Sequence, residues 1–143
     1  MHAALTAAEL EKLLAAEFPE AFHAESGLEI IDIRHGGARV RLAAQPKTTR
    51  PGGTISGPTL MMLADVAMYV ALLASIGWVP LAVTVNLNIH FLRKPRPGAL
   101  VAECRLIKLG RRLAVGEIML FSEGEGEPVA QATSTYAIPT ENK

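Results

Sequence analysis

The sequence of 143 residues is poor in the side chains that form disulfides and bind metals. Its single cysteine, Cys104, cannot form an intrachain disulfide, which favours the reducing cytoplasm. No metal-ligand spacing is present among the four histidines, so we expect no structural metal. These histidines are His2, His23, His35 and His90.

An excess of charge of one sign is also absent, because 14 Lys and Arg residues balance 14 Asp and Glu residues. Such a chain has no net field that would gather nucleic acid or an anionic membrane, and its basic clusters do not exceed the pair Arg111-Arg112. We therefore expect no nucleic-acid partner.

Signals for export or membrane insertion are missing as well. The N-terminal residues lack the basic start and unbroken apolar core of a signal peptide. The long apolar run, residues 60–74, is shorter than the roughly 20 residues that a bilayer requires, and it contains Asp65. We expect no membrane partner and a helix that is buried inside the protein.

The chain does have enough apolar residues, 50% of the total, for one real core. We expect a single domain over residues 1–143, with an N-terminal helical segment (1–26) and a core (27–138). Thr6 and Glu9 form a capping box for a first helix. A second helix begins with Pro58 as its first residue, is apolar on every face, and ends at Gly77.

Alternating and apolar segments predict six strands. Residues 27–33 and 38–44 read as a hairpin before the long helix, and three strands at 99–109, 113–121 and 128–138 close the chain. Between them, residues 83–91 alternate apolar side chains with polar ones, which places Thr84 on the polar face. The short links imply an antiparallel sheet, and an α+β fold in which this sheet wraps around the long helix.

Asp65 is the one carboxylate within the apolar helix. An unpartnered buried carboxylate costs several kcal/mol or shifts its pKa upward, so a functional role is one explanation. The other is a buried Asp that is satisfied by backbone donors.

The segments GGTISGPTLMMLADVAM, VNLNIHFLRKP and LGRRLAVGEIMLF resemble the hotdog-fold thioesterases of the phenylacetate-degradation (PaaI-like) family over residues 27–138. This resemblance implies hydrolysis of acyl-coenzyme A without metal or bound cofactor, in a homodimer or a dimer of dimers such as a homotetramer. It also implies that Asp65 is catalytic, and that Thr84 helps to hold the attacking water.

The family pattern at the helix start is Asn, two residues, Gly, two residues, His-Gly-Gly. Gly53 and Gly57 match its first two glycines, whereas Arg50 stands where Asn or Gln is usual, Ser56 replaces His, and Pro58 replaces the last Gly. Arg50 and Pro58 are candidates for substrate binding.

Thioester hydrolysis requires a donor to the carbonyl oxygen and a base or nucleophile at the carbonyl carbon. The backbone N–H of Gly57, at a helix start, suits the first role, although a simple turn glycine is the alternative. Asp65 suits the second role, either as a general base or as a nucleophile. Eight residues separate the two by about 12 Å along one helix, so a shared site requires Gly57 from one chain and Asp65 from its partner.

The other candidates each have two interpretations. Ser56 either caps the helix or orients a water. Arg50 pairs with an acidic group or is solvated, and Arg111 and Arg112 bind coenzyme A phosphates or form a solvated hairpin tip. The side chains of Leu60, Met61, Met62, Tyr69 and Trp78 are candidates for an acyl tunnel.

Two other functions compete with thioester hydrolysis. A hotdog hydratase or dehydratase would generally pair a His with an acid near the central helix, and no His lies between His35 and His90. A non-catalytic acyl-CoA-binding protein is the second alternative, in which the changes at Arg50 and Ser56 reflect lost activity.

Overall fold

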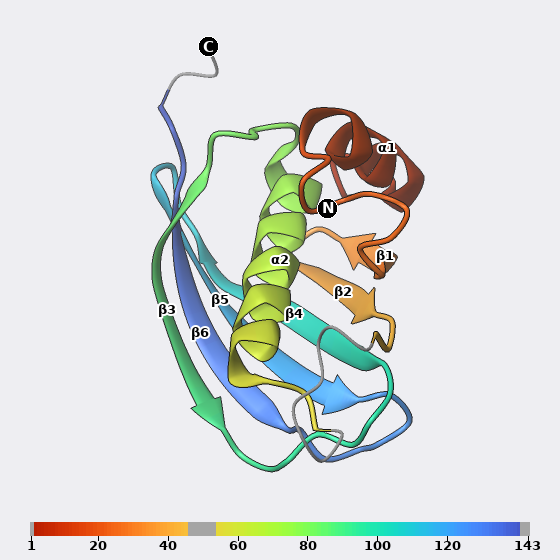
Figure 1. Ribbon diagram of the computed structural model, residues 1–143. Coiled ribbons are helices and arrows are strands. Elements are labelled where there is room, and N and C mark those ends of the chain that lie inside the picture. Colours follow the sequence, from red (N-terminus) through yellow and green to blue (C-terminus); the bar gives the residue numbers. More distant parts are fainter. Residues whose placement is uncertain (1, 46–53, 141–143) are drawn as a thin grey trace.

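A curved antiparallel sheet surrounds one long helix in the computed structural model, which describes residues 2–45 and 54–140 (Figure 1). The helices are α1 (Ala7–Glu17) and α2 (Gly57–Ile76). The strands are β1 (Leu28–Arg34), β2 (Gly37–Leu42), β3 (Val83–Phe91), β4 (Leu100–Leu109), β5 (Leu113–Ser122) and β6 (Ala130–Ala137). The predicted α+β architecture and the predicted order of elements are confirmed.

The strand order in the sheet is β1-β2-β4-β5-β6-β3, and every neighbouring pair is antiparallel. Three pairs join consecutive strands through short turns, as the hairpin signals predict. The other two, β2 with β4 and β6 with β3, connect segments that are distant in the sequence. The pairing of β6 with β3 brings the end of β6 beside the start of β3, and the candidate site lies there.

Helix α2 is the centre of the core. Its N-cap is Ser56, and its first residue is Gly57. The helix thus begins one residue earlier than predicted, so Pro58 is its second residue and not its first. Gly77, at φ 95°, ends the helix as expected. By length and composition α2 would pass for a membrane span, but 72% of its apolar window is buried inside the protein, which is typical of a core helix.

Helix α1 protects one edge of the sheet. It begins with the predicted capping box between Thr6 and Glu9, and it buries Leu10 and Leu14 against the core. The carboxylate of Glu11 accepts a hydrogen bond from the backbone N–H of Ile30, in the edge strand β1, at 2.9 Å. A side chain thus satisfies a strand-edge donor that would otherwise be available to another chain.

The opposite edge, β3, contains a β-bulge that corrects one expectation. Pairing with β6 shifts between Thr84 and Asn86, so Val85 is the extra residue. Thr84 pairs with the buried Tyr136, and Leu87 pairs with the buried Ser134, so both side chains share the face that covers α2. Strict alternation places Thr84 on the polar face, which is wrong, because a bulge changes the side to which the strand directs its side chains.

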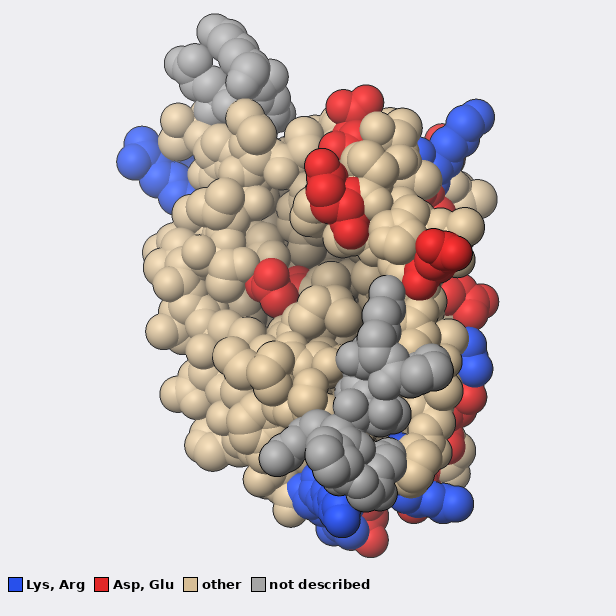
Figure 2. Space-filling model, viewed as in Figure 1, with Lys and Arg blue, Asp and Glu red and all other residues tan. Residues whose placement is uncertain are grey.

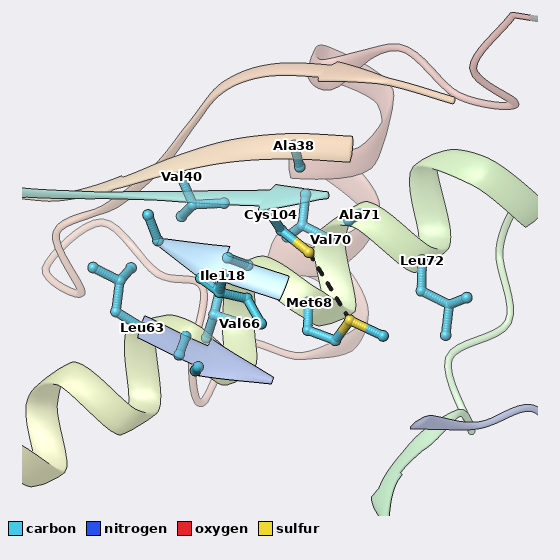
Figure 3. Close-up of a cluster of buried hydrophobic side chains, with 14 of the residues drawn as sticks. Ala38, Val40, Leu63, Val66, Met68, Val70, Ala71, Leu72, Cys104 and Ile118 are labelled. Atoms are coloured by element: carbon cyan, nitrogen blue, oxygen red, sulfur yellow. Dashed lines mark hydrogen bonds between the residues drawn. The ribbon is translucent and has the colours of Figure 1, made fainter. Parts of the chain in front are cut away.

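The core is closely packed where α2 crosses β4 and β5. Met68 of α2 and Cys104 of β4 are buried with their sulfur atoms 3.9 Å apart (Figure 3). Burial raises the pKa of the Cys104 thiol to about 12, so this cysteine is an unreactive core residue. A Cβ atom on Gly116 of β5 would lie only 2.5 Å from Met68 Sδ and 3.2 Å from Cys104 Sγ.

We therefore expect Gly116→Val to lower the free energy of unfolding by about 1–3 kcal/mol through overpacking. Gly126→Val is the control, because a Cβ on Gly126 meets nothing within 4 Å and the change should stay within about 0.5 kcal/mol. Chemical denaturation of both variants measures the difference. Equal free energies of unfolding for the two variants would contradict this expectation, because they would show that the Met68 and Cys104 side chains can move aside without loss of stability.

Candidate active site

A cavity of about 800 Å³ opens between α1, α2 and the segment that leads from α2 into β3. The surface is hollowed on this face, with acidic side chains in and above the hollow and basic side chains at the periphery (Figure 2). Much of the lining is apolar or aromatic, and it includes Phe18, Met62, Tyr69, Trp78 and Leu81.

Asp65 lies in the wall of this cavity and is half-buried rather than enclosed in the core. Its Oδ1 atom accepts two hydrogen bonds, one from the Thr84 hydroxyl at 2.7 Å and one from the Tyr136 hydroxyl at 2.9 Å. The Tyr136 hydroxyl also lies 3.4 Å from the Asp65 backbone oxygen. The partners of the carboxylate are thus side-chain hydroxyls from two strands, not the backbone donors that a purely structural Asp was expected to have.

Tyr136 is the site residue that sequence reasoning missed. It is only 3% exposed, and its ring stacks on that of Tyr69 with centroids 6.0 Å apart. Burial raises the pKa of Tyr136 well above its ordinary value, so its hydroxyl stays protonated and acts as a donor. Nothing in the alternating pattern of β6 distinguishes this tyrosine from a packing residue; only the pairing of β6 with β3 places it beside Asp65.

Gly57 is the first residue of α2 and precedes Asp65 by more than two helical turns. A Cβ at this position would be 3.4 Å from the ring of Phe91, at the end of β3, so the glycine leaves room for that ring. It does not belong to the cavity lining that contains Asp65. The structure therefore does not bring these two residues together within one chain, in accordance with the spacing of about 12 Å expected from helix rise.

Ser56 is a helix cap in this structure. Its hydroxyl oxygen accepts a hydrogen bond from the Thr59 backbone N–H at 3.4 Å and lies 2.9 Å from the Thr59 hydroxyl. Pro58, next in the helix, is exposed. Both side chains remain near Gly57 and apart from the cavity lining.

Two of the remaining candidates, Arg111 and Arg112, are separate from the cavity. Arg111 and Arg112 are exposed in the turn between β4 and β5, just beyond the end of the sheet that contains Tyr136, and neither lines the cavity. Arg50 lies outside the described residues, as does Gly53.

The proposed acyl-tunnel residues divide into two groups. Met62, Tyr69 and Trp78 line the cavity, whereas Leu60 is buried in the core and Met61 is 40% exposed outside it. The outer part of the lining also contains Glu17, Glu20 and His23. No cluster of three His, Cys, Asp or Glu side chains suited to a metal ion occurs in residues 2–45 and 54–140.

A half-exposed carboxylate fixed by two hydroxyls beside an apolar cavity suits general-base or nucleophilic attack on a carbonyl carbon. Residues 52–129 match the sequence model of the thioesterase superfamily, and the chain belongs to this family. It is a thioester hydrolase with the hotdog fold, as its resemblance to PaaI-like proteins implies.

Three similar proteins illustrate the relationship. A Silicibacter sp. TM1040 structure, provisionally described as a thioesterase, is 44% identical with a TM-score of 0.87, and the match covers 97% of this chain and 95% of that one. The phenylacetic acid degradation protein PaaI of Thermus thermophilus, as a point mutant, is 26% identical with a TM-score of 0.69, over 79% and 94% of the chains. A 1,4-dihydroxy-2-naphthoyl-CoA hydrolase of Listeria monocytogenes is 27% identical over 69% of this chain and 80% of its own length.

We expect Ser56→Ala to lower the free energy of unfolding by about 1 kcal/mol, because the change removes a helix cap, and to change kcat only slightly. Thermal unfolding and steady-state kinetics measure the two effects. A deep loss of kcat at an unchanged melting temperature would instead place Ser56 in the catalytic set.

Proposed function

We propose that the protein hydrolyses an acyl-coenzyme A thioester to the free acid and coenzyme A. Asp65 is the base or nucleophile, and the backbone N–H of Gly57 in the partner chain is the oxyanion donor. The observation that supports this most strongly is the Asp65 carboxylate, held by Thr84 and Tyr136 in the wall of an apolar cavity in a thioesterase fold.

The cavity suits an acyl group more than the coenzyme. Its apolar and aromatic walls favour a neutral acyl group, whereas Glu17 and Glu20 in its lining repel the phosphates of coenzyme A. The acyl end therefore enters the cavity and the coenzyme stays outside, so that the thioester carbon reaches Asp65. The name of the Listeria relative, a hydrolase of an aromatic acyl-CoA, supports a coenzyme A thioester as substrate.

The open edge of β3 supports association into a homodimer. Apolar side chains along and beside this strand are between 39% and 63% exposed; they are Met61, Met62, Leu81, Val83, Val85, Phe91 and Leu92. A strand edge of this kind, flanked by apolar side chains, favours pairing with another chain. A second copy on a two-fold axis would cover this surface and bring the start of its α2 toward Asp65.

We expect Asp65→Asn to fold normally and to lower kcat at least about a hundredfold. The Asn side-chain oxygen can still accept from Thr84 and Tyr136, so stability should change little, whereas the base or nucleophile is lost. Asp32→Asn is the matched control, because Asp32 pairs with Arg39 at the surface, away from the cavity. Turnover of a panel of short, long and aromatic acyl-CoA thioesters measures the loss.

Two results would contradict this proposal. Retention of turnover by Asp65→Asn to within about threefold of the wild type would make Asp65 structural. Binding of acyl-CoA by the wild type without any turnover would indicate a non-catalytic acyl-CoA-binding protein instead.

The shared site predicts rescue between two inactive variants. The first variant is Asp65→Asn. The second is Gly57→Val, in which a bulky side chain blocks the helix start. The two variants are unfolded together and then refolded. Each mixed dimer has one site with both changes and one site with neither, so random pairing should restore about a quarter of wild-type activity.

Mass spectrometry of the intact dimers provides the necessary control, since it shows whether mixed dimers have formed. If they form and the mixture remains as inactive as its components, the shared site is wrong. Asp65 would then work with a donor other than Gly57.

A further inference from the structure

The two hydroxyl donors at Asp65 act on the same oxygen atom. Thr84 and Tyr136 both donate to Oδ1, and no hydrogen bond from the described residues reaches Oδ2. A carboxylate can rotate about its Cβ–Cγ bond, and two donors that converge from neighbouring strands on one oxygen restrict that rotation. The free oxygen is therefore the one that can attack the thioester or activate water.

We propose that Tyr136 is a positioning residue for catalysis, whose hydroxyl holds Asp65 Oδ1 so that Oδ2 is presented to the thioester carbon. This inference rests on the proposed thioester hydrolysis by Asp65. It assigns Tyr136 a role that depends on its hydroxyl alone, separate from the packing role of its ring.

Tyr136 is itself held in place on two sides. Its strand pairs with β5 through Ala114 and with β3 through Thr84, so the two donors to Asp65 lie directly opposite each other across one strand pair. Its ring stacks on Tyr69, whose own hydroxyl donates to the Pro80 carbonyl oxygen at 2.9 Å. The donor thus has little freedom to follow Asp65 if the carboxylate turns.

Packing alone does not explain the hydroxyl. A phenylalanine would fill the same buried space and would avoid the desolvation of a polar group. The hydroxyl's shortest hydrogen bond goes to the Asp65 carboxylate, and hydrogen bonds to charged groups are stronger than those between neutral groups. Its removal should therefore affect the reaction more than the fold.

The test compares the two tyrosines of the chain. Tyr136→Phe should lower kcat roughly ten- to a hundredfold, the range for one lost hydrogen bond to a charged group, with KM within about twofold and little change in melting temperature. Tyr69→Phe makes the same chemical change in the same cavity, but its hydroxyl bonds to Pro80. Because this hydroxyl does not contact Asp65, the loss of kcat in Tyr69→Phe should be clearly smaller than the loss in Tyr136→Phe.

A double variant tests whether the two donors act as a unit. Thr84→Val removes the other hydrogen bond to Oδ1 with little change in shape. If both hydroxyls restrain one oxygen, the combined loss of kcat in Thr84→Val/Tyr136→Phe should be smaller than the product of the single losses. A full product of the two losses would show that the hydroxyls act independently and would overturn the joint restraint.

Crystal structures of the wild type and Tyr136→Phe give a readout that does not require activity. A rotated or two-position Asp65 carboxylate in the variant supports positioning; an unmoved carboxylate, or a kcat equal to that of an active wild type, overturns it. If the wild type hydrolyses no acyl-CoA, the proposed function fails. In that case, the carboxylate orientations in the two crystal structures still show whether the Tyr136 hydroxyl positions Asp65.

Discussion

The arrangement of this protein depends on the need to cover α2, a helix that is apolar on nearly every face. An ordinary amphipathic helix is covered on one side, but this one requires neighbours all around it. The sheet curves over one side and α1 covers part of another (Figure 1). Asp65 is the single ionisable group in the helix apart from Tyr69, and it lies where this cover is incomplete, between α1 and the start of β3. The location of the candidate active site thus follows from the gap in the packing around α2.

Local sequence patterns were sufficient for the elements but not for the contacts at the site. The capping box at Thr6, the cap at Ser56 and the stop at Gly77 are local signals, and alternation defined the strands to within two residues at each bound. The position of Thr84 depended on the bulge at Val85, and a period of two contains no signal for an extra residue.

Tyr136 could not be recognised for a related reason. It contacts Asp65 only because β6 lies between β5 and β3, and that order is set by pairing between segments far apart in the chain. Asp65 itself was found because one charge in a long apolar run is a local anomaly. A tyrosine in an alternating strand is not unusual, so the contact of Tyr136 with Asp65 is evident only from the three-dimensional structure.

The two edge strands of the sheet, β1 and β3, differ in their cover. Helix α1 lies against β1, where Glu11 accepts a hydrogen bond from the backbone N–H of Ile30. If the proposed homodimer pairs through β3, the presence of α1 at the β1 edge leaves each subunit one open edge, so strand pairing would stop at two subunits. Without α1, each subunit would present two usable edges, and pairing would add further subunits at both ends. In the proposed assembly, the N-terminal helix would therefore favour a closed pair of subunits over an open-ended ribbon.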